Sequence, residues 1–133
     1  MNEEYILLKK ENKYSIIIIK SGLFYNVYGR DAIIISNITN YKLFFYNDKL
    51  CISFPKESLN LLLSRLRTRN IGYIVLNKNS KEIYLGKDVS YIKEYNESSK
   101  VRERELILEE ILIKIKKLDY DKIKEINNSI ERK

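Results

Sequence analysis

The chain has 133 residues, a single cysteine (Cys51) and a formal net charge of +7. A chain of this length can form one domain whose hydrophobic core needs neither disulfides nor a structural metal. Cys51 cannot pair within the chain, no apolar run approaches the length of a membrane span, and the start at Glu3 and Glu4 is unlike a signal peptide. We therefore expect a soluble, cytoplasmic protein.

The positive charge is concentrated in the first part of the chain. Residues 1–98 carry 15 basic and 10 acidic side chains, whereas residues 99–133 carry 10 and 8. A basic balance favours polyanionic partners through phosphate contacts and counterion release. A coding sequence rich in A and T, which favours Lys, Ile and Asn, explains the excess nearly as well, so charge alone leaves a nucleic-acid partner open.

The first predicted elements are a helix or strand over residues 3–10 and a strand at Ile16–Ile19. Residues 3–10 are apolar enough to pair as a strand with Ile16–Ile19, and a helix is the alternative. Ile16–Ile19 show no polar alternation, which is typical of a central strand covered on both faces. A further helix is expected from about Tyr28 to Asn37.

A sharp corner is predicted after this strand, at Ser21 and Gly22. Gly22 can adopt backbone angles that are closed to other residues. Phe24 and Tyr25 are therefore expected at the end of the sheet. The alternative is that both rings simply close the end of the hydrophobic core.

The middle of the chain predicts two further pairs of strands with a helix between them. Leu43–Tyr46 and Leu50–Ser53 flank Asn47 and Asp48, which tolerate left-handed turn angles, so a hairpin is expected. Tyr73–Asn77 and Glu82–Leu85 form the second pair. A helix that starts near the only proline has one buried face, made of Leu59, Leu62, Leu63 and Leu66.

The last part of the chain predicts helices. Asp88 is expected to cap a short helix that ends near Tyr95, and the polar residues 96–99 separate it from a long helix over Lys100–Leu118. Asp119 is expected to cap a final turn or two. We divide the chain into an α/β part, residues 1–98, and C-terminal amphipathic helices, residues 99–133, packed on it or on a partner.

The long helix has two apolar stripes. Leu106 and Ile113 form a second stripe opposite the main one and are predicted to contact protein. Either the helix lies between the sheet and the final helix, or the stripe contacts a second copy or another protein. The main stripe comprises Val101, Ile107, Leu108, Ile111, Leu112, Ile115 and Leu118.

Several kinds of catalytic site are excluded by composition. The sequence has no histidine, so Ser-His, Cys-His and histidine-ligated metal sites are excluded. The four glycines form no phosphate-binding loop of the Gly-x-x-x-x-Gly-Lys type. We expect no enzyme, no metal site and no cofactor.

Two ungapped blocks carry a family resemblance. The first runs from Gly22 through Phe24 and Tyr25 to Asp31-Ala32, and the second runs from Ile52-Ser53-Phe54-Pro55 through the leucine helix to residues 70–76. In this order and spacing they resemble the N-terminal, mismatch-recognition domain (domain I) of the MutS family, over roughly residues 5–118. The resemblance implies an α/β fold, a mixed sheet flanked by helices, with a C-terminal helical extension. It also implies a helix over residues 3–10, which is the interpretation that we adopt.

The resemblance also implies a role for the corner. In the family, the aromatic residue that corresponds to Phe24 wedges into the base stack from the minor groove, and a Glu two positions later bonds the displaced base. Here Asn26 replaces that Glu and Leu23 replaces an Asp. The wedge is kept and the charge is lost, so mismatch discrimination of the family's kind is not implied.

The sequence therefore predicts a nucleic-acid-associated accessory subunit that binds DNA or an RNA–DNA duplex weakly on its own. Similar free-standing domains accompany the reverse transcriptase of diversity-generating retroelements, which would supply a larger partner. The rival interpretation is a protein-docking adaptor that works through its C-terminal helices, and a homo-oligomer is left open. The predicted nucleic-acid contacts are Phe24, Tyr25, Asn26, Lys20, Arg30, Arg65 and Arg69.

Overall fold

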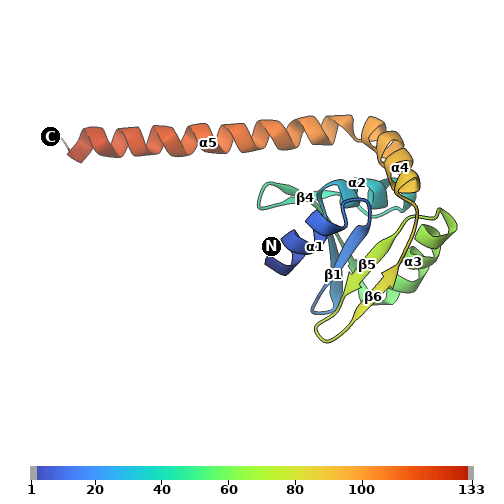
Figure 1. The fold of residues 1–133 in the computed structure, drawn as a ribbon. Helices are drawn as coiled ribbons and strands as arrows, with labels where there is room; N and C mark the ends of the chain where they lie inside the picture. The colour runs from blue at the N-terminus through green and yellow to red at the C-terminus, as the bar shows by residue number, and fades with distance from the viewer. Residues whose placement is uncertain (1–2, 132–133) are drawn as a thin grey trace.

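The fold is a mixed six-stranded sheet with helices on both faces and one long helix that projects from it (Figure 1). The structure is a computed structural model that describes residues 3–131, with side chains described up to residue 125. In chain order the elements are α1 (Glu3–Glu11), β1 (Ile16–Ser21), β2 (Phe24–Tyr28), α2 (Gly29–Ile38), β3 (Phe44–Tyr46), β4 (Lys49–Pro55), a 3-10 turn (Lys56–Ser58), α3 (Leu59–Thr68), β5 (Tyr73–Leu76), β6 (Lys81–Tyr84), α4 (Asp88–Val101) and α5 (Glu103–Glu131).

The strand order is β3-β4-β2-β1-β5-β6, with β1 and β5 parallel and every other neighbouring pair antiparallel. The predicted α/β class with a mixed sheet is therefore confirmed. Ile16, Ile17 and Ile18 of β1 are fully buried, as expected of a central strand covered on both faces. The helical interpretation of residues 3–10 is also confirmed, because α1 occupies this segment.

The two faces of the sheet are covered unequally. On one face the larger core packs the strands against α2, α3 and Tyr91 of α4. On the other face a smaller cluster joins Tyr5 and Leu8 of α1 to Ile17 and Ile19 of β1, to β5 and to the end of β2. No other helix contributes to this smaller core among the described residues, so the part of this face formed by β2, β4 and β3 is largely open.

Local sequence explains the turns and the first helices. Asn47 and Asp48 both have positive φ (48° and 67°), and they make the two-residue turn of the predicted β3–β4 hairpin. The helix predicted from Tyr28 to Asn37 is present as α2, one residue later at each end. β2 was not expected as a strand: after the turn at Gly22 the chain pairs with β1 before α2 begins.

The C-terminal helices differ from the prediction. α4 continues through the polar residues 96–99 to Val101, and its N-cap residue is Lys87, whose side chain makes no capping bond. The chain bends at Arg102, and α5 then runs without a break past Asp119. Because Ser98 is buried and Arg102 donates to Ser36 of α2 at 3.2 Å, the contacts of this segment with α2 favour a continuous α4.

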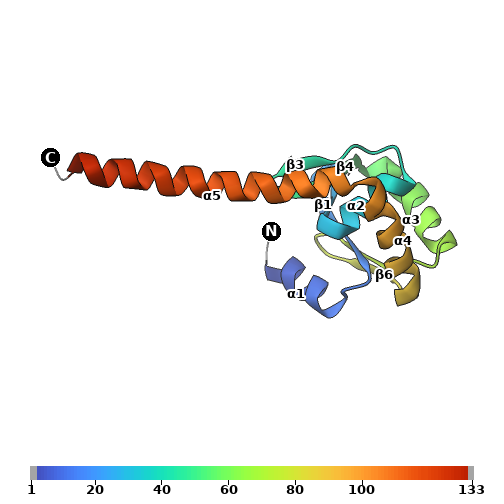
Figure 2. The same ribbon diagram turned by 90° about the horizontal axis from the view of Figure 1, so that it is seen from above.

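α5 lies across the β3–β4 hairpin and then extends beyond the sheet (Figures 1 and 2). A carboxylate oxygen of Glu109 accepts a hydrogen bond from the Leu50 amide at 2.9 Å, and Lys116 pairs with Asp48. The side chains of residues 110–125 are all exposed. No described helix of this length is apolar enough to cross a membrane.

Asp31, in the first turn of α2, connects four elements although it is fully buried. Its carboxylate accepts hydrogen bonds from Lys9 of α1 (2.8 Å), from the Ile17 amide of β1 (3.0 Å) and from the Tyr91 hydroxyl of α4 (2.6 Å). Burial raises the pKa of the Asp31 carboxyl, and the Lys9 ammonium and the three hydrogen bonds oppose this shift. The Asp-Ala pair of the sequence motif therefore has a structural role.

Candidate nucleic-acid interface

The predicted corner is the tight turn between β1 and β2. Gly22 has φ of 63°, a left-handed angle that suits glycine, and no atom lies within 4 Å of the place of a Cβ. Ser21 pairs with Phe24, so Phe24 is the first residue of β2 beyond the turn. The Phe24 side chain is 48% exposed, and the ring therefore lies at the surface as the corner prediction requires.

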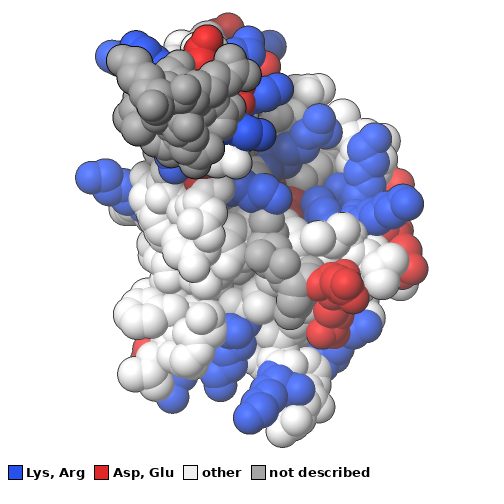
Figure 3. All heavy atoms as spheres, turned by 90° about the vertical axis from the view of Figure 1, so that its left-hand side faces the viewer, with Lys and Arg blue, Asp and Glu red and all other residues white. Residues whose placement is uncertain are grey.

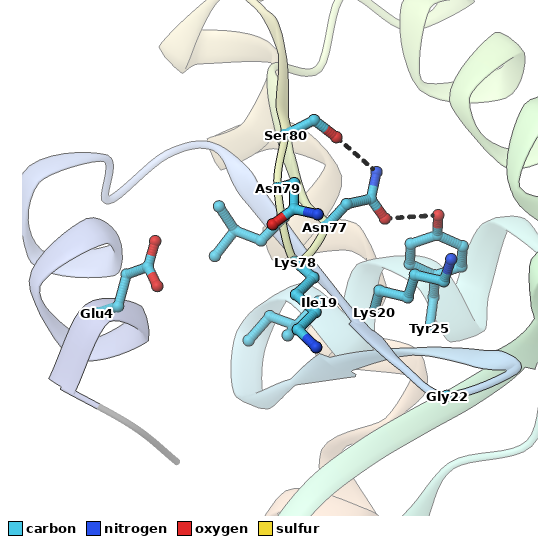
Figure 4. Close-up of a pocket in the computed structure, with 10 residues that line it drawn as sticks. Glu4, Ile19, Lys20, Gly22, Tyr25, Asn77, Lys78, Asn79 and Ser80 are labelled. Carbon is cyan, nitrogen blue, oxygen red and sulfur yellow. Dashed lines mark hydrogen bonds between the residues drawn. The ribbon is translucent and has the colours of Figure 1, made fainter.

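Tyr25 does not share this exposure. It is only 5% exposed, and its ring stacks on Phe54 of β4 with centroids 5.8 Å apart. Its hydroxyl donates to the side-chain oxygen of Asn77 at 2.9 Å, and Asn77 in turn donates to Ser80 at 3.3 Å (Figure 4). For Tyr25 the core interpretation is therefore correct. Tyr25 holds the corner against the β5–β6 turn and offers no ring to a base.

A hollow lies between these two turns (Figure 4). Its volume is about 770 Å³, and Lys20 and Lys78 line it together with the first turns of α1 at Glu4. Lys20 is exposed and pairs with Tyr25, so it is the predicted basic residue that lies at the corner, on the Tyr25 face of the two strands and not on the Phe24 face.

Asn26 and Tyr28 lie on the same face of β2 as Phe24, because alternate residues of a strand share a face. The Asn26 amide donates to the Tyr28 hydroxyl at 3.3 Å. Partial burial raises the pKa of Tyr28, so its hydroxyl stays protonated and remains a donor at neutral pH. The face thus presents the Phe24 ring and the Asn26 amide, while the half-buried Tyr28 ring packs edge-on against Tyr5, with centroids 5.7 Å apart, and keeps its hydroxyl beside Asn26.

The predicted arginines are not gathered at the corner. Arg30 lies beyond the other end of β2, and its guanidinium lies over the Tyr95 ring, 5.3 Å from the centroid. Arg65 donates to the Ile38 carbonyl at 3.2 Å, and Arg69 pairs with Glu94 at 3.9 Å. Both lie on or next to α3, which covers the opposite face of the sheet from Phe24. The structure therefore does not bring Arg65 and Arg69 together with the wedge.

The contacts of α5 with the β3–β4 hairpin show which of its two stripes faces the sheet. Leu106 is half-buried, and it shares a side of the helix with Glu109 and Lys116, which contact the hairpin. Ile113 lies on this side too but is exposed. The main stripe points away from the sheet, with every member from Val101 to Leu118 exposed by 36–67%. The main stripe, and not the Leu106 stripe, is therefore the apolar surface that α5 presents to solvent.

Three aromatic residues on the open face were not predicted to belong to an interface. Tyr28 follows from the alternation along β2, which becomes visible only when residues 24–28 are recognised as a strand. Phe44 and Tyr46 are exposed on β3. Their placement follows from the turn at Asn47-Asp48, which pairs Tyr46 with Lys49 and Phe44 with Cys51.

The protein is thus a mixed α/β domain that exposes the Phe24 ring at the β1–β2 turn, at the end of its sheet. The family model described as MutS domain I matches residues 1–107, and the chain belongs to this family. The domain is thus of the DNA-recognition type. No curated protein matches the chain.

Proposed function

We propose that this protein is a non-catalytic, nucleic-acid-associated accessory subunit whose contact with nucleic acid is centred on the β1–β2 turn. The observation that carries the proposal is the exposed Phe24 ring, which follows the turn directly. The strand that carries this ring, β2, pairs with β1 on one side and with β4 on the other. An apolar side chain held rigidly at the surface can enter a base step and partly unstack it. The hydrogen bond from Tyr25 to Asn77 keeps the turn in place while it does so.

The replacement of the family's acidic residue determines what kind of binding we expect. Asn26 has both a donor and an acceptor but no charge, and its amide already bonds Tyr28. The neutral amide adds no repulsion toward phosphates and no charged partner for a displaced base. We therefore expect binding to flexible duplexes, including an RNA–DNA duplex, with little preference for mismatches.

The affinity of the isolated chain should be modest. Lys20 is the predicted phosphate contact at the corner, and few phosphate contacts give little affinity at physiological salt. A larger partner would supply the rest, and we propose a reverse transcriptase of a diversity-generating retroelement. A reverse transcriptase gene next to the gene for this chain would support that context, whereas neighbouring clamp and ATPase genes would favour a repair complex.

Binding of short labelled duplexes at low salt, for wild type and Phe24→Ala, tests the proposal. Loss of one stacking contact is worth about 1–3 kcal/mol. The expected loss of affinity is therefore about 5-fold to 150-fold. Leu23→Ala is the matched control, because Leu23 is also exposed on the same turn but has no ring. Equal affinities for wild type and Phe24→Ala would refute the role of the corner.

A second candidate function is protein docking through α5, which the exposed main stripe favours. Residues 103–110 carry four acidic side chains and one basic, whereas residues 114–124 carry five lysines and two aspartates. Two antiparallel copies of α5 would place the acidic half of each against the basic half of the other, with the apolar stripes between them. A second copy is thus the partner that the charges fit.

Analytical ultracentrifugation tests this second function. Paired substitution of Leu108 and Ile115 by Asp should convert a dimer to a monomer, and the same change at Leu85 and Val89, which are exposed elsewhere, should not. A wild-type chain that remains monomeric at about 100 µM, where even a weak dimer would be populated, would remove self-association through α5.

A further inference from the structure

The open part of the sheet face forms a continuous trough that leads from the corner to a group of basic side chains. A hollow of about 340 Å³ is lined by Ser21, Asn26, Tyr28, Phe44, Tyr46 and Ser53. A second hollow shares Tyr28 and Tyr46 with it, and a third shares Tyr28 and Lys49 with the second. The trough therefore runs along β2, β4 and β3 to the start of α2.

Strand register explains why these side chains gather there. Tyr28, Cys51 and Phe44 form one row across β2, β4 and β3, and Lys49 and Tyr46 form the next row. Neighbouring strands lie about 4.8 Å apart and same-face residues along a strand about 7 Å apart. Tyr28 and Phe44 are thus about 10 Å apart, a spacing that places several aromatic rings within reach of one extended ligand.

The described residues leave the trough unfilled. Phe24, Phe44 and Tyr46 are exposed by 48%, 40% and 57%, and Ser53 between them is exposed as well. In Figure 2, α1 and β3 flank the side toward which α5 projects. Figure 3 shows the molecule from that side, with a broad uncharged area below α5 and Lys and Arg on its border.

The far end of the trough is basic. The hollow next to α2 has a volume of about 460 Å³, and its lining includes five cationic side chains against the one carboxylate of Glu109. Lys9 is held by Asp31, and the Glu109 carboxylate accepts the Leu50 amide. The other cations of this end are Lys10, Lys13, Arg30 and Lys49.

We infer that this trough binds single-stranded nucleic acid, with bases on the aromatic side chains and the backbone on the basic end. Rings on a sheet with a basic groove beside them are the usual means of binding single strands without sequence preference. Asn26 and Ser53 add hydrogen-bonding groups between the rings. The inference rests on the proposed function and extends it, because the strand that the corner separates from its partner would lie along this face.

The test is binding of a fluorescein-labelled oligothymidylate of about 12 nucleotides, measured by anisotropy at low salt. We expect Phe44→Ala and Tyr46→Ala each to weaken binding about tenfold. Lys49→Ala should reduce the salt slope by about 0.7, since that is the contribution of one phosphate contact to a single strand. An oligouridylate of the same length shows whether RNA binds as well.

Two control variants distinguish a loss of stacking from a loss of folding. Phe45→Ala removes a similar ring from the same strand, but Phe45 pairs with buried Leu50 and faces the other side of the sheet. It should leave binding unchanged. Tyr46→Phe keeps the ring and should bind like wild type, so a loss with Tyr46→Ala alone is attributable to stacking.

The outcomes separate this inference from the proposed function. If Phe24→Ala abolishes duplex binding while Phe44→Ala and Tyr46→Ala leave single-strand binding intact, the inference about the trough is refuted and the proposed role of the corner is supported. If the β3 variants lose single-strand binding and Phe24→Ala keeps its duplex binding, the inference about the trough is supported and the proposed role of the corner is refuted. If wild type binds neither duplex nor single strand, both are overturned.

Discussion

Replacing Asp31 should destabilise the protein more than any change at a surface ion pair. Asp31→Ala leaves the Lys9 ammonium without its carboxylate partner at 2.8 Å, with only the carbonyls of Lys13 and Ser15 as acceptors. It also removes the acceptor of the buried Ile17 amide and of the Tyr91 hydroxyl. Breaking a buried pair by removing one partner costs about 3–5 kcal/mol. This is a large share of the roughly 5–15 kcal/mol by which domains are stable.

Urea unfolding followed by far-ultraviolet circular dichroism measures this loss as a shift of the midpoint. Lys116→Ala is the control, because Lys116 and Asp48 form an exposed pair that is worth at most about 1 kcal/mol. The double variant Lys9→Met with Asp31→Asn should be more stable than either single variant, since no unpaired charge stays buried. A loss below about 1 kcal/mol for Asp31→Ala would refute the structural role of this carboxylate.

Two further predictions concern Cys51 and Gly86. Burial raises the pKa of the Cys51 thiol to about 11 from 9.0, so at pH 8 the folded protein should react with iodoacetamide about a hundredfold more slowly than the urea-unfolded chain. The same shift means that Cys51 lowers the free energy of unfolding as the pH rises through 9.0 towards 11. Buried tyrosines with raised pKa values add to this fall above their ordinary pKa of 10.0, so Cys51→Ala should reduce the slope between pH 9.0 and 10.0, and equal slopes there for the two proteins would contradict the prediction. Gly86→Ala should cost about 3 kcal/mol, measured as the shift of the urea midpoint, because a Cβ there meets the backbone of Asn70, Ile71 and Gly72. Gly22→Ala has open space and should cost only about 1 kcal/mol of backbone strain, so equal losses at both glycines would contradict the steric argument.

The parts of the fold that the sequence predicted are those with a strong local signal. The run Ile16–Ile19 marks a central strand, and the leucines from Leu59 to Leu66 mark the buried face of α3. Asn47 and Asp48 mark a hairpin because both tolerate positive φ. In each case neighbouring residues alone determine the backbone.

The predictions were wrong where contacts between residues far apart in the sequence determine the structure. Residues 96–99 have low helix propensity, yet α4 continues because Ser98 is buried and Arg102 bonds Ser36 of α2. Tyr25 and Phe24 are adjacent and chemically similar, and only the alternation of β2 shows that one faces the core and the other the surface. The sequence therefore located the corner and could not assign its two rings.

The direction of α5 could not be predicted for a similar reason. Helical periodicity identifies two apolar stripes but not which of them meets the sheet. The contacts of Glu109 with the Leu50 amide and of Lys116 with Asp48 determine which side of α5 faces the sheet. Leu50 and Asp48 belong to the β3–β4 hairpin, about 60 residues earlier in the chain. A pattern among neighbouring residues of α5 therefore cannot predict these contacts.

The trough and the main stripe of α5 face different directions, and this bears on how a weak binder can act. The trough lies on the sheet face between α1 and β3, whereas the stripe points away from the sheet on the far side of α5. Nucleic acid and a second copy of the chain could therefore bind at the same time. Two copies joined through α5 would present two troughs to one strand, and the second contact would form at a raised effective concentration. Self-association would then strengthen binding without any new contact to nucleic acid, so the α5 variant that yields a monomer should also bind oligothymidylate more weakly.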